Sequence, residues 1–479
     1  MSDVSPPPPN DDFFPVVEEL CPAPDPEGAF QRFAHLPRVV FFDSARRDPV
    51  LGRYSFLAAD PFAWYRIDVA GGDALGALQR ELSRFAARRQ PDLPPFQGGA
   101  AGLLSYELGR QLERVPAARI DEFRMPATAV GLYDVVVAWD HVEHRAWIVS
   151  QGFPETDVAR RRARAEARAA AVRETLRKAV PSATVRSAAS AGPPLTIVAP
   201  QHEIGSLPGL SSNLTPAAYF DAVRRAVEYV CAGDVFQVNI AQRLLHPAVD
   251  DAAALYLRLR RRNPATFAGY FDLGDRQIVS ASPERFLRCV ERHVEARPIK
   301  GTRLRMQLPE ADLFAAGDLL LSDKDRAENV MIVDLLRNDL SRVCEADSVR
   351  VPQLCALESY EYVQHLVSSV EGTLRDDCRS IDVLRAAFPG GSITGAPKIR
   401  AMEIIAELEP TARGAYCGSL AYLGFDGTLD ASILIRTITA GGGWWQAPVG
   451  GGITARSDPE REYDETWHKA EGLLRSLLP

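Results

Sequence analysis

The chain has 479 residues, a hydrophobic fraction of 46% and a formal net charge of −8. Such a chain can bury a large core, and its acidic balance argues against general affinity for nucleic acid or an anionic membrane surface. Seven scattered cysteines without a CxxC pair favour free thiols over a disulfide framework or a zinc site. No charged-then-apolar leader and no membrane-spanning apolar run is visible, so we expect a cytoplasmic protein without a membrane role.

The first half of the chain predicts a tail followed by a mainly antiparallel β region. Four consecutive prolines within residues 1–12 favour a disordered tail. Between Val39 and Val149, short β-rich runs alternate with turn residues, which is typical of antiparallel strands. The Ala/Arg-rich stretch 154–181 predicts a solvated connecting helix, and a Ser/Ala/Gly/Pro-rich linker is predicted over residues 187–194. We therefore expect an N-terminal region over residues 13–195.

A second region, residues 214–479, begins at a clear helix start. Thr215 followed by proline is typical of an N-cap and a first helical position, and Gly233 predicts the end of that helix. Further β-rich runs predict strands, and a long apolar helix is predicted over 323–343. Glu328 shares a row of this helix with hydrophobic residues. It requires a cationic partner, because burial of an unpaired carboxylate is costly.

The C-terminal segment predicts another acidic helix. Asp458 and the proline after it are typical of a helix start, and Glu462, Glu465 and Lys469 then follow at i, i+3 and i+7 on one face. This helix alone fits an ordinary Glu–Lys surface pair. Together with Glu328, however, two acidic helices favour a site for Mg²⁺, which prefers oxygen ligands.

Two further segments carry groups suited to anions. The glycine-rich stretch 449–454 predicts a turn whose exposed backbone amides favour a carboxylate or phosphate. Residues 431–438 predict a strand on which Arg436 lies among hydrophobic residues and needs a planar anionic partner. That partner is either a structural carboxylate or a ligand carboxylate. The glycine-rich run 388–398 fails the P-loop pattern, so we do not expect ATP or GTP binding.

Lys300 follows a proline and precedes a Gly-Thr pair. A single lysine in such a loop is most often solvated. An amine enclosed in a substrate cavity, by contrast, can act as a nucleophile because desolvation favours its neutral form.

Several long motifs in the same order resemble the chorismate-utilising enzymes. The resemblance covers roughly residues 214–475 and continues weakly through residues 41–44 and 54–56. This family includes enzymes that form anthranilate, isochorismate, salicylate or 4-amino-4-deoxychorismate. The resemblance implies an α+β fold, a large two-layer antiparallel β-sandwich with helices outside, to which both halves of the chain contribute. The motifs are Pro298-Ile-Lys-Gly-Thr302, Asp334-Leu-Leu-Arg-Asn-Asp-Leu340, Gly391-Ser-Ile-Thr-Gly-Ala-Pro-Lys398 and Glu462-x-x-Glu465-x-x-x-Lys469.

The resemblance also implies the metal and substrate contacts. Glu328 and Glu465 resemble the Mg²⁺ ligands, and Glu462 is expected to act nearby through water. The metal is expected to hold the ring carboxylate of chorismate. The remaining carboxylate contacts and pocket lining are implied for Ser392, Tyr416, Arg436, Gly450, Gly451, Gly452 and Lys469.

The implied catalytic residues indicate which reaction to expect. Lys300 resembles a nucleophile with Glu284 as its acid/base partner, and Thr302 and His365 are expected close to the ring. Water-adding members of the family carry a lysine base where this chain has Gln237, so activation of water is not expected. Members that form anthranilate carry a small residue where this chain has Lys300. The lysine resembles the members that form 4-amino-4-deoxychorismate.

The resemblance therefore implies an amino-group transferase that joins chorismate and ammonia through a covalent Lys300 intermediate, for para-aminobenzoate and folate biosynthesis. The chain lacks the Gly-x-Cys-x-Gly turn of a glutaminase nucleophile, so ammonia is expected from a separate glutamine amidotransferase subunit. Two alternatives stay open. One is an enzyme that forms anthranilate, and the other is a non-catalytic relative that only binds the glutaminase.

Overall fold

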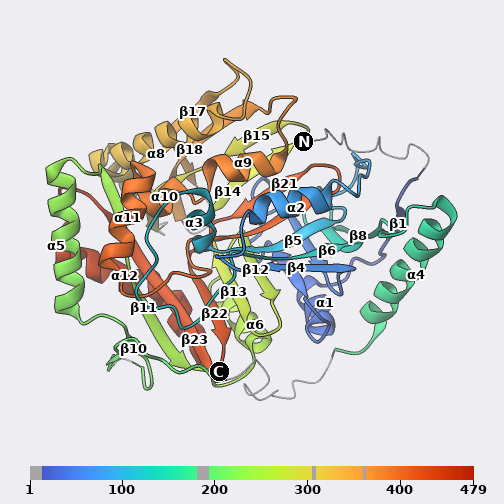
Figure 1. The fold of residues 1–479 in the computed structure, drawn as a ribbon, viewed down its shortest axis with the longest axis horizontal. Helices are drawn as coiled ribbons and strands as arrows, with labels where there is room; N and C mark the ends of the chain where they lie inside the picture. Colours follow the sequence, from blue (N-terminus) through green and yellow to red (C-terminus); the bar gives the residue numbers. More distant parts are fainter. Residues whose placement is uncertain (1–12, 181–193, 206, 305–308, 360–362, 479) are drawn as a thin grey trace.

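The computed structural model describes residues 13–180, 194–205, 207–304, 309–359 and 363–478. Two β-sheets form the centre of this part of the chain, and helices lie around them (Figure 1). The α+β class expected from the sequence is confirmed. The predicted tail lies outside the described residues, as does the predicted linker except for its last residue.

The first sheet, which we call the large sheet, joins a block of strands from residues 16–150 to a block from residues 202–453. Its neighbouring strands pair antiparallel throughout the described residues. In spatial order they are β1 (Val16–Glu19), β8 (Arg145–Ser150), β7 (Val135–Asp140), β3 (Tyr54–Ala58), β2 (Val40–Asp43), β12 (Phe267–Asp272), β13 (Gln277–Ser282), β22 (Thr437–Gly441), β23 (Trp444–Ile453), β11 (Gln237–Pro247), β10 (Ser211–Ser212) and β9 (His202–Glu203), with β19 (Gly395–Ala396) beside β11.

The second sheet, the small sheet, is likewise antiparallel and mixes both halves of the chain. Each sheet therefore contains strands from both halves of the chain, side by side in two blocks. In spatial order its strands are β16 (Ile299–Leu304), β18 (Val363–Thr373), β15 (His293–Ala296), β14 (Arg285–Val290), β21 (Leu429–Ser432), β20 (Ser419–Gly424), β5 (Gly99–Leu104), β6 (Thr128–Tyr133) and β4 (Ala63–Ile67), with β17 (Arg350–Ser359) beside β18.

The two sheets pack face to face through a buried aromatic core. Phe56 and Phe271 from the large sheet belong to one hydrophobic cluster with Leu103 and Tyr422 from the small sheet. Phe96 stacks on Tyr422 with ring centroids 4.6 Å apart, and Phe56 meets the same ring edge-on at 5.6 Å. Aromatic pairs at these separations stabilise a core beyond the burial of area alone. The two-layer sandwich expected from the resemblance is confirmed.

Helices cover the outer faces of both sheets. In chain order they are α1 (Pro26–Phe33), α2 (Ala74–Leu82), the 3₁₀ helix η1 (Tyr106–Leu108), α3 (Gly109–Leu112), α4 (Val158–Arg177), α5 (Pro216–Ala232), α6 (Ala252–Arg262), α7 (Pro309–Leu321), α8 (Asp323–Ser341), α9 (Ser380–Ala387), α10 (Gly391–Thr394), α11 (Lys398–Leu408) and α12 (Pro459–Leu477). Phe30, Tyr256 and Leu473 bring α1, α6 and α12 against the large sheet. Ile332 and Leu384 bring α8 and α9 against the small sheet.

The predicted helix starts are confirmed. Thr215 Oγ1 accepts a hydrogen bond from the third amide of α5 at 3.1 Å, and α5 ends at Gly233, whose φ is 85°. Asp458 caps α12 in the same way, through a 3.0 Å bond from the amide of Arg461. Each cap satisfies an amide that has no partner within its own helix. The helices predicted over 154–181 and 323–343 are α4 and α8.

The strand predicted over 431–438 is wrong, because the chain crosses there from the small sheet to the large sheet. β21 ends at Ser432, and β22 begins at Thr437. Between them Arg436 adopts a left-handed conformation with φ of 51°. This conformation breaks the alternation of side chains on which the prediction depended. Arg436 therefore lies in the connection between the sheets and not on a sheet face.

The turn predicted over 449–454 is also wrong. Gly450, Gly451 and Gly452 lie in β23 and pair in register with β11. A side chain at Gly452 would meet the Gln237 amide nitrogen at 2.3 Å. Glycine at this position leaves room for the Gln237 side chain of the neighbouring strand. It does not mark a change of chain direction.

The cysteines carry free thiols, as expected from the sequence. All seven lie in the described part of the chain and none is disulfide-bonded; Cys289, Cys344, Cys355 and Cys417 are buried. Among the residues that the structure describes, no helix is both long and apolar enough to cross a membrane.

Candidate active site

Lys300 lies in β16, at one edge of the small sheet. The pairing of β16 with β18 shifts between Lys300 and Thr302. Gly301, at the shift, has φ of 66°, and a side chain there would meet a methyl group of Leu319 at 2.5 Å. The bulge therefore requires glycine. The side chain of Thr302 lies outside the described residues, so its expected role stays a prediction.

The amine of Lys300 is linked to Glu284 through Ser392. Lys300 Nζ donates to the carbonyl oxygen of Ser392 at 3.4 Å, and the Ser392 hydroxyl donates to Glu284 Oε1 at 3.0 Å. Asn239 Nδ2 donates to the same carbonyl at 2.9 Å. The structure therefore brings together three residues expected in the site. Asn239 was not predicted, although its position two residues after Gln237 on the same strand was a usable signal.

Glu284 and Arg436 lie where the chain passes between the sheets. Glu284 stands between β13 of the large sheet and β14 of the small sheet, and Arg436 stands between β21 and β22. The amide of Ile433 donates to the carbonyl of Glu284 at 3.0 Å, which joins the two crossings directly. Two neighbouring connections thus bring a carboxyl group and a guanidinium group into one site.

Glu284 is almost completely buried, with 6% of its surface exposed. Burial raises the pKa of Glu284 to about 7, although Lys300, the Ser392 hydrogen bond and Arg436 each favour the ionised form. A carboxyl group with a pKa near neutrality can both accept and donate a proton at physiological pH. The predicted acid/base role of Glu284 is therefore supported by its environment as well as by its position.

Two hydrogen bonds fix Lys398, at the C-terminal end of the glycine-rich segment that carries Ser392. Lys398 Nζ donates to Asp339 Oδ2 at 2.7 Å and to the carbonyl of Ala387 at 2.6 Å. Asp339 lies on α8, the helix that also carries Glu328. The lysine of the glycine-rich motif therefore has a structural role, which agrees with the failure of the P-loop pattern.

The three expected metal ligands come from two helices, α8 and α12, and lie among lysines. Lys324 Nζ lies 4.0 Å from Glu328 and 3.4 Å from Glu462, and Lys469 Nζ lies 2.7 Å from Glu465. Sequence reasoning missed Lys324. Its position four residues before Glu328 on the same helix was the available signal.

These contacts shift the pKa values of the carboxyl groups in opposite directions. Burial raises the pKa of Glu328, and the ammonium groups of Lys300 and Lys324 only partly oppose the rise. Burial acts in the same direction on Glu465. There Lys469, Lys324 and Lys300 outweigh it and hold the pKa of Glu465 below its ordinary value. Additional positive charge at the site would favour the ionised form of Glu328.

The carboxylates fit Mg²⁺ in charge and donor type. Glu328 Oε1 is buried and has no hydrogen-bond partner, so this oxygen is available to a cation. No group of three potential metal ligands is already assembled within the described residues. Lys324 provides positive charge between Glu328 and Glu462, and its side chain is 47% exposed. That exposure leaves the ammonium group free to turn into solvent when another cation takes its place.

Gly451 leaves open the space between the two acidic helices. A side chain at this position would lie 3.3 Å from Glu462 Oε2, 3.5 Å from Lys469 Nζ and 3.7 Å from Glu465 Oε1. Lys469 also donates to the carbonyl of Gly450 at 3.0 Å. Gly451 and the carbonyl of Gly450 therefore lie beside the charged side chains of α12, and they do so as part of a strand.

The guanidinium group of Arg436 makes no hydrogen bond and no ion pair with the residues that the structure describes. Burial lowers the pKa of Arg436, although the charge of Glu284 favours the protonated form. A partly buried guanidinium group without such a partner is suited to bind a planar anion. Of the two alternatives that the sequence left open, a ligand carboxylate is therefore favoured over a structural one.

His365 interacts with Arg436, and Tyr416 lies with its ring centroid 5.8 Å from the guanidinium carbon of Arg413. Burial lowers the pKa of His365 to about 4, and the charges of Arg436 and Arg46 act in the same direction. His365 is therefore neutral at neutral pH. Tyr416 is 7% exposed, and burial raises its pKa well above the ordinary value.

Gln237 is fully buried, and neither its amide nitrogen nor its amide oxygen has a hydrogen-bond partner. Its side chain lies over Gly452, whose partner across the strands is Asn239. A neutral amide cannot take a proton from water, so the expectation that this chain does not activate water agrees with the residue present.

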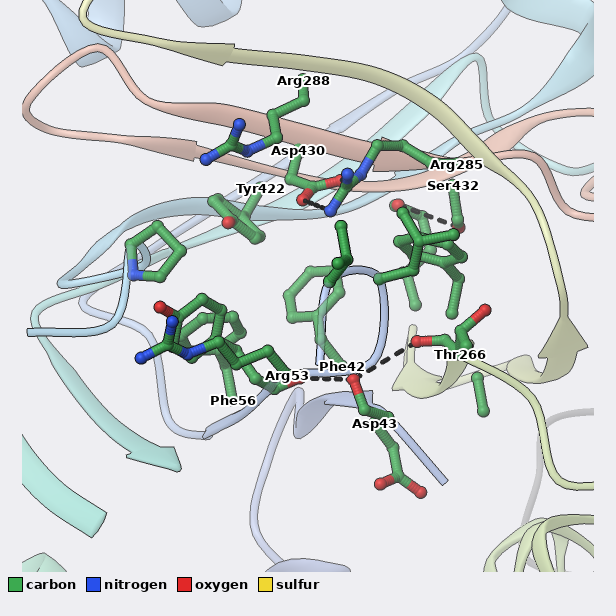
Figure 2. A pocket seen from close by; sticks show the side chains of 18 of the residues that line it. Phe42, Asp43, Arg53, Phe56, Thr266, Arg285, Arg288, Tyr422, Asp430 and Ser432 are labelled. Carbon is green, nitrogen blue, oxygen red and sulfur yellow. Dashed lines mark hydrogen bonds and ion pairs between the residues drawn. The ribbon is translucent and has the colours of Figure 1, made fainter. Parts of the chain in front are cut away.

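A cavity of about 400 Å³ lies between the sheets (Figure 2). Phe42, Phe56 and Tyr422 line it, and Arg285 pairs with Asp430 at its wall with an Nη2–Oδ2 distance of 3.2 Å. None of the site residues expected from the sequence lines this cavity. It is distinct from the site around Lys300.

Comparison with known proteins identifies the class. The profile described as chorismate binding enzyme matches residues 55–475. This match spans most of the chain, so the protein belongs to the chorismate binding enzyme family.

Its relatives within this family have two different names. Aminodeoxychorismate synthase component 1 of Escherichia coli (strain K12) is 39% identical over 463 residues, which cover 94% of this chain and 95% of that protein. Anthranilate synthase component 1 of Thermus thermophilus is 41% identical over 389 residues, which cover 81% and 79%. The structure of anthranilate synthase component I from Streptococcus pneumoniae TIGR4 aligns with a TM-score of 0.75 at 29% identity, over 88% of this chain and 92% of that chain.

We predict that Ser392→Ala moves the acidic limb of the pH profile to higher pH. If turnover requires ionised Glu284, it falls as the pH drops below about 7. Loss of the Ser392 hydroxyl removes a hydrogen bond that favours the ionised form, so the pKa of Glu284 rises further. The measurement is chorismate consumption as a function of pH, with the exposed Ser341→Ala as control. An unchanged limb in Ser392→Ala would contradict the link between Ser392 and Glu284.

Proposed function

We propose that this enzyme converts chorismate and ammonia to 4-amino-4-deoxychorismate, with Lys300 as the nucleophile. The proposal rests on the position of the Lys300 amine, which lies 3.4 Å from the carbonyl oxygen of Ser392. The hydroxyl of the same serine donates a hydrogen bond to Glu284. The pKa of Glu284 is about 7, so its carboxylate can accept the proton that an attacking amine must lose. The name of the Escherichia coli relative supports the same product.

The proposed reaction has two displacements. The neutral amine of Lys300 attacks C2 of chorismate, both ring double bonds shift, and the C4 hydroxyl leaves as water with the proton that the amine loses. Ammonia then attacks C4, both double bonds shift back, and the bond between C2 and the lysine nitrogen breaks. The lysine is regenerated, and the enolpyruvyl group stays on the product. In the first step Glu284 transfers the proton of the attacking amine to the leaving hydroxyl, and in the second it transfers a proton from the attacking ammonia to the departing lysine nitrogen.

The remaining residues bind the substrate in this proposal. The guanidinium group of Arg436 pairs with one carboxylate of chorismate, because it has no hydrogen-bond or ion-pair partner among the described residues. Pairs of arginine with a carboxylate are planar and bidentate. Glu328, Glu462 and Glu465 would hold Mg²⁺, which supplies positive charge against the ring carboxylate when it is bound. The neutral ring of His365 adds no charge beside the reacting carbons.

We further propose that ammonia comes from a glutaminase subunit. Cys417 is 3% exposed, and burial raises the pKa of its thiol to about 12, so it is unsuited to attack glutamine. The relatives are named component 1, which implies a second component for those proteins. With such a partner, the product would serve para-aminobenzoate and folate biosynthesis.

Formation of anthranilate is the second candidate. It is favoured by the Thermus thermophilus relative, which is 41% identical and is named anthranilate synthase component 1. In that reaction ammonia attacks C2 directly, and no lysine nucleophile is needed. The identity of the product from chorismate and ammonium therefore separates the two candidates.

We predict that the purified chain consumes chorismate with ammonium salts but not with glutamine. The chain supplies the chorismate site, whereas its buried Cys417 cannot act as a glutaminase nucleophile. The assay measures the loss of chorismate with each nitrogen source. Glutamine-dependent turnover by the chain alone, free of contaminating amidotransferase, would rule out the need for a glutaminase subunit.

We predict that Lys300→Ala abolishes 4-amino-4-deoxychorismate and leaves slow direct amination at C2. The alanine removes the nucleophile and leaves space that ammonia can enter. Products are separated and identified by mass and by the fluorescence of anthranilate. Lys300→Arg is the matched control, since it keeps the positive charge but cannot supply a neutral amine. If Lys300→Ala forms the aminodeoxy product at the wild-type rate, Lys300 is not the nucleophile.

We predict that Glu328→Gln and Glu465→Gln each reduce turnover by about 10²-fold or more, and that chelation of Mg²⁺ does the same. Each change removes one charge from the set of oxygen ligands. Glu460→Gln, on the exposed first turn of α12, is the control. Thermal unfolding shows whether the variants stay folded. Full activity of both variants, or of the enzyme in chelator, would contradict the metal assignment.

A further inference from the structure

A buried ion pair lies directly behind the Ser392 peptide. Arg413 and Glu409 are each 4% exposed. Arg413 Nε donates to Glu409 Oε2 at 2.9 Å, and Arg413 Nη2 donates to Glu409 Oε1 at 2.6 Å. Glu409 Oε1 also accepts from the amide of Ala241 on β11 at 2.9 Å. The carboxylate is thus fixed to the large sheet, and it fixes the plane of the guanidinium group.

The guanidinium group of Arg413 also donates to two backbone carbonyl groups near Ser392. Arg413 Nη1 donates to the carbonyl of Ile393, the next residue, at 2.9 Å. Arg413 Nη2 donates to the carbonyl of Asn239 at 3.1 Å. The side chain of Asn239 in turn donates to the carbonyl of Ser392 at 2.9 Å, the same oxygen that Lys300 reaches.

Stability alone does not explain an ion pair at this place. The cost of desolvating a buried pair usually cancels its attraction, and apolar side chains of similar volume stabilise a core equally well. What apolar side chains cannot supply is a rigid fork of donors aimed at two carbonyl groups. The ion pair therefore orients the guanidinium donors toward the backbone carbonyl groups beside Ser392.

We infer that Glu409 and Arg413 are positioning residues for the proposed reaction. They hold the Ser392 peptide so that its carbonyl meets the Lys300 amine while its hydroxyl meets Glu284. Neither residue touches the reacting groups. The inference rests on the proposed function only in placing Ser392 at the reacting groups; the contacts themselves do not depend on which product is formed.

Arg413→Lys tests this inference. Lysine keeps a positive charge beside Glu409 but cannot donate to Glu409 and both carbonyls in one plane. The matched control is Arg243→Lys, which alters another buried pair, Arg243–Glu122, whose side chains are both 4% exposed. We expect chorismate turnover by Arg413→Lys to fall by about 10²-fold relative to the control, with a smaller change in KM, because misplacement of reacting groups acts mainly on kcat.

A second readout distinguishes positioning from general damage. Glu284 faces Lys300, Ser392 and Arg436, and Cys417 is also near enough to interact with it. If the Ser392 hydroxyl no longer reaches Glu284, the acidic limb of the pH profile moves to higher pH, as it does in Ser392→Ala. Amide hydrogen exchange over residues 391–396 should also be faster in Arg413→Lys than in the control.

Asn239→Ala keeps the test decisive if Arg413→Lys does not fold. It removes the hydrogen bond to Ser392 and leaves the buried pair intact, and it should move the acidic limb in the same direction. The inference is overturned if the variant that folds has a turnover within about twofold of that of Arg243→Lys and an acidic limb at the same pH as that control. The identity of the wild-type product is determined in parallel. If that product is anthranilate, the proposed function fails, while the loss of chorismate turnover in Arg413→Lys would still support positioning.

Discussion

Neutralisation of closely spaced carboxylates is the constraint on which the site depends. Glu328 lies within 4.0 Å of Lys324, Glu462 lies within 3.4 Å of the same lysine, and Glu465 lies 2.7 Å from Lys469. Carboxylates brought this close to one another repel unless cations separate them. The alternation of acidic and basic side chains allows the two helices to approach β23, and it leaves a region where an anionic substrate with a divalent cation can replace lysine contacts.

The fold supplies the second requirement, which is a fixed distance between the proposed nucleophile and its proposed base. Lys300 comes from the edge of the small sheet, and Glu284 comes from a crossing between the two sheets. Their separation could not be fixed by a single element, since they belong to different parts of the sandwich. Ser392 connects them through its carbonyl and its hydroxyl, and Arg413 holds that segment from behind. The chemistry proposed for Lys300 therefore depends on packing at some distance from it.

Local patterns predicted the helices well and the connections poorly. The caps at Thr215 and Asp458 depend on neighbouring residues only, and both were predicted from the sequence. The face shared by Glu462, Glu465 and Lys469 follows from helical spacing. The path of residues 431–438 depends on which sheet each part joins, and hydrophobic alternation carries no such information. The sandwich itself was expected through resemblance to a family and not from any local pattern. The pairing of Glu409 with Arg413 stood in the sequence at i, i+4, but its contacts with Ser392 depend on the fold.

The most direct test of the account is a search for the covalent intermediate. The enzyme is mixed with chorismate and Mg²⁺ in the absence of ammonia, quenched rapidly, and measured by intact mass and peptide mass spectrometry. If Lys300 is the nucleophile, an adduct with the mass of chorismate less one water forms on the peptide that contains Lys300. The adduct disappears when ammonium is added, and it does not form in Lys300→Arg. Aminodeoxychorismate formation at the normal rate, with no adduct on Lys300 at any quench time, would contradict the account.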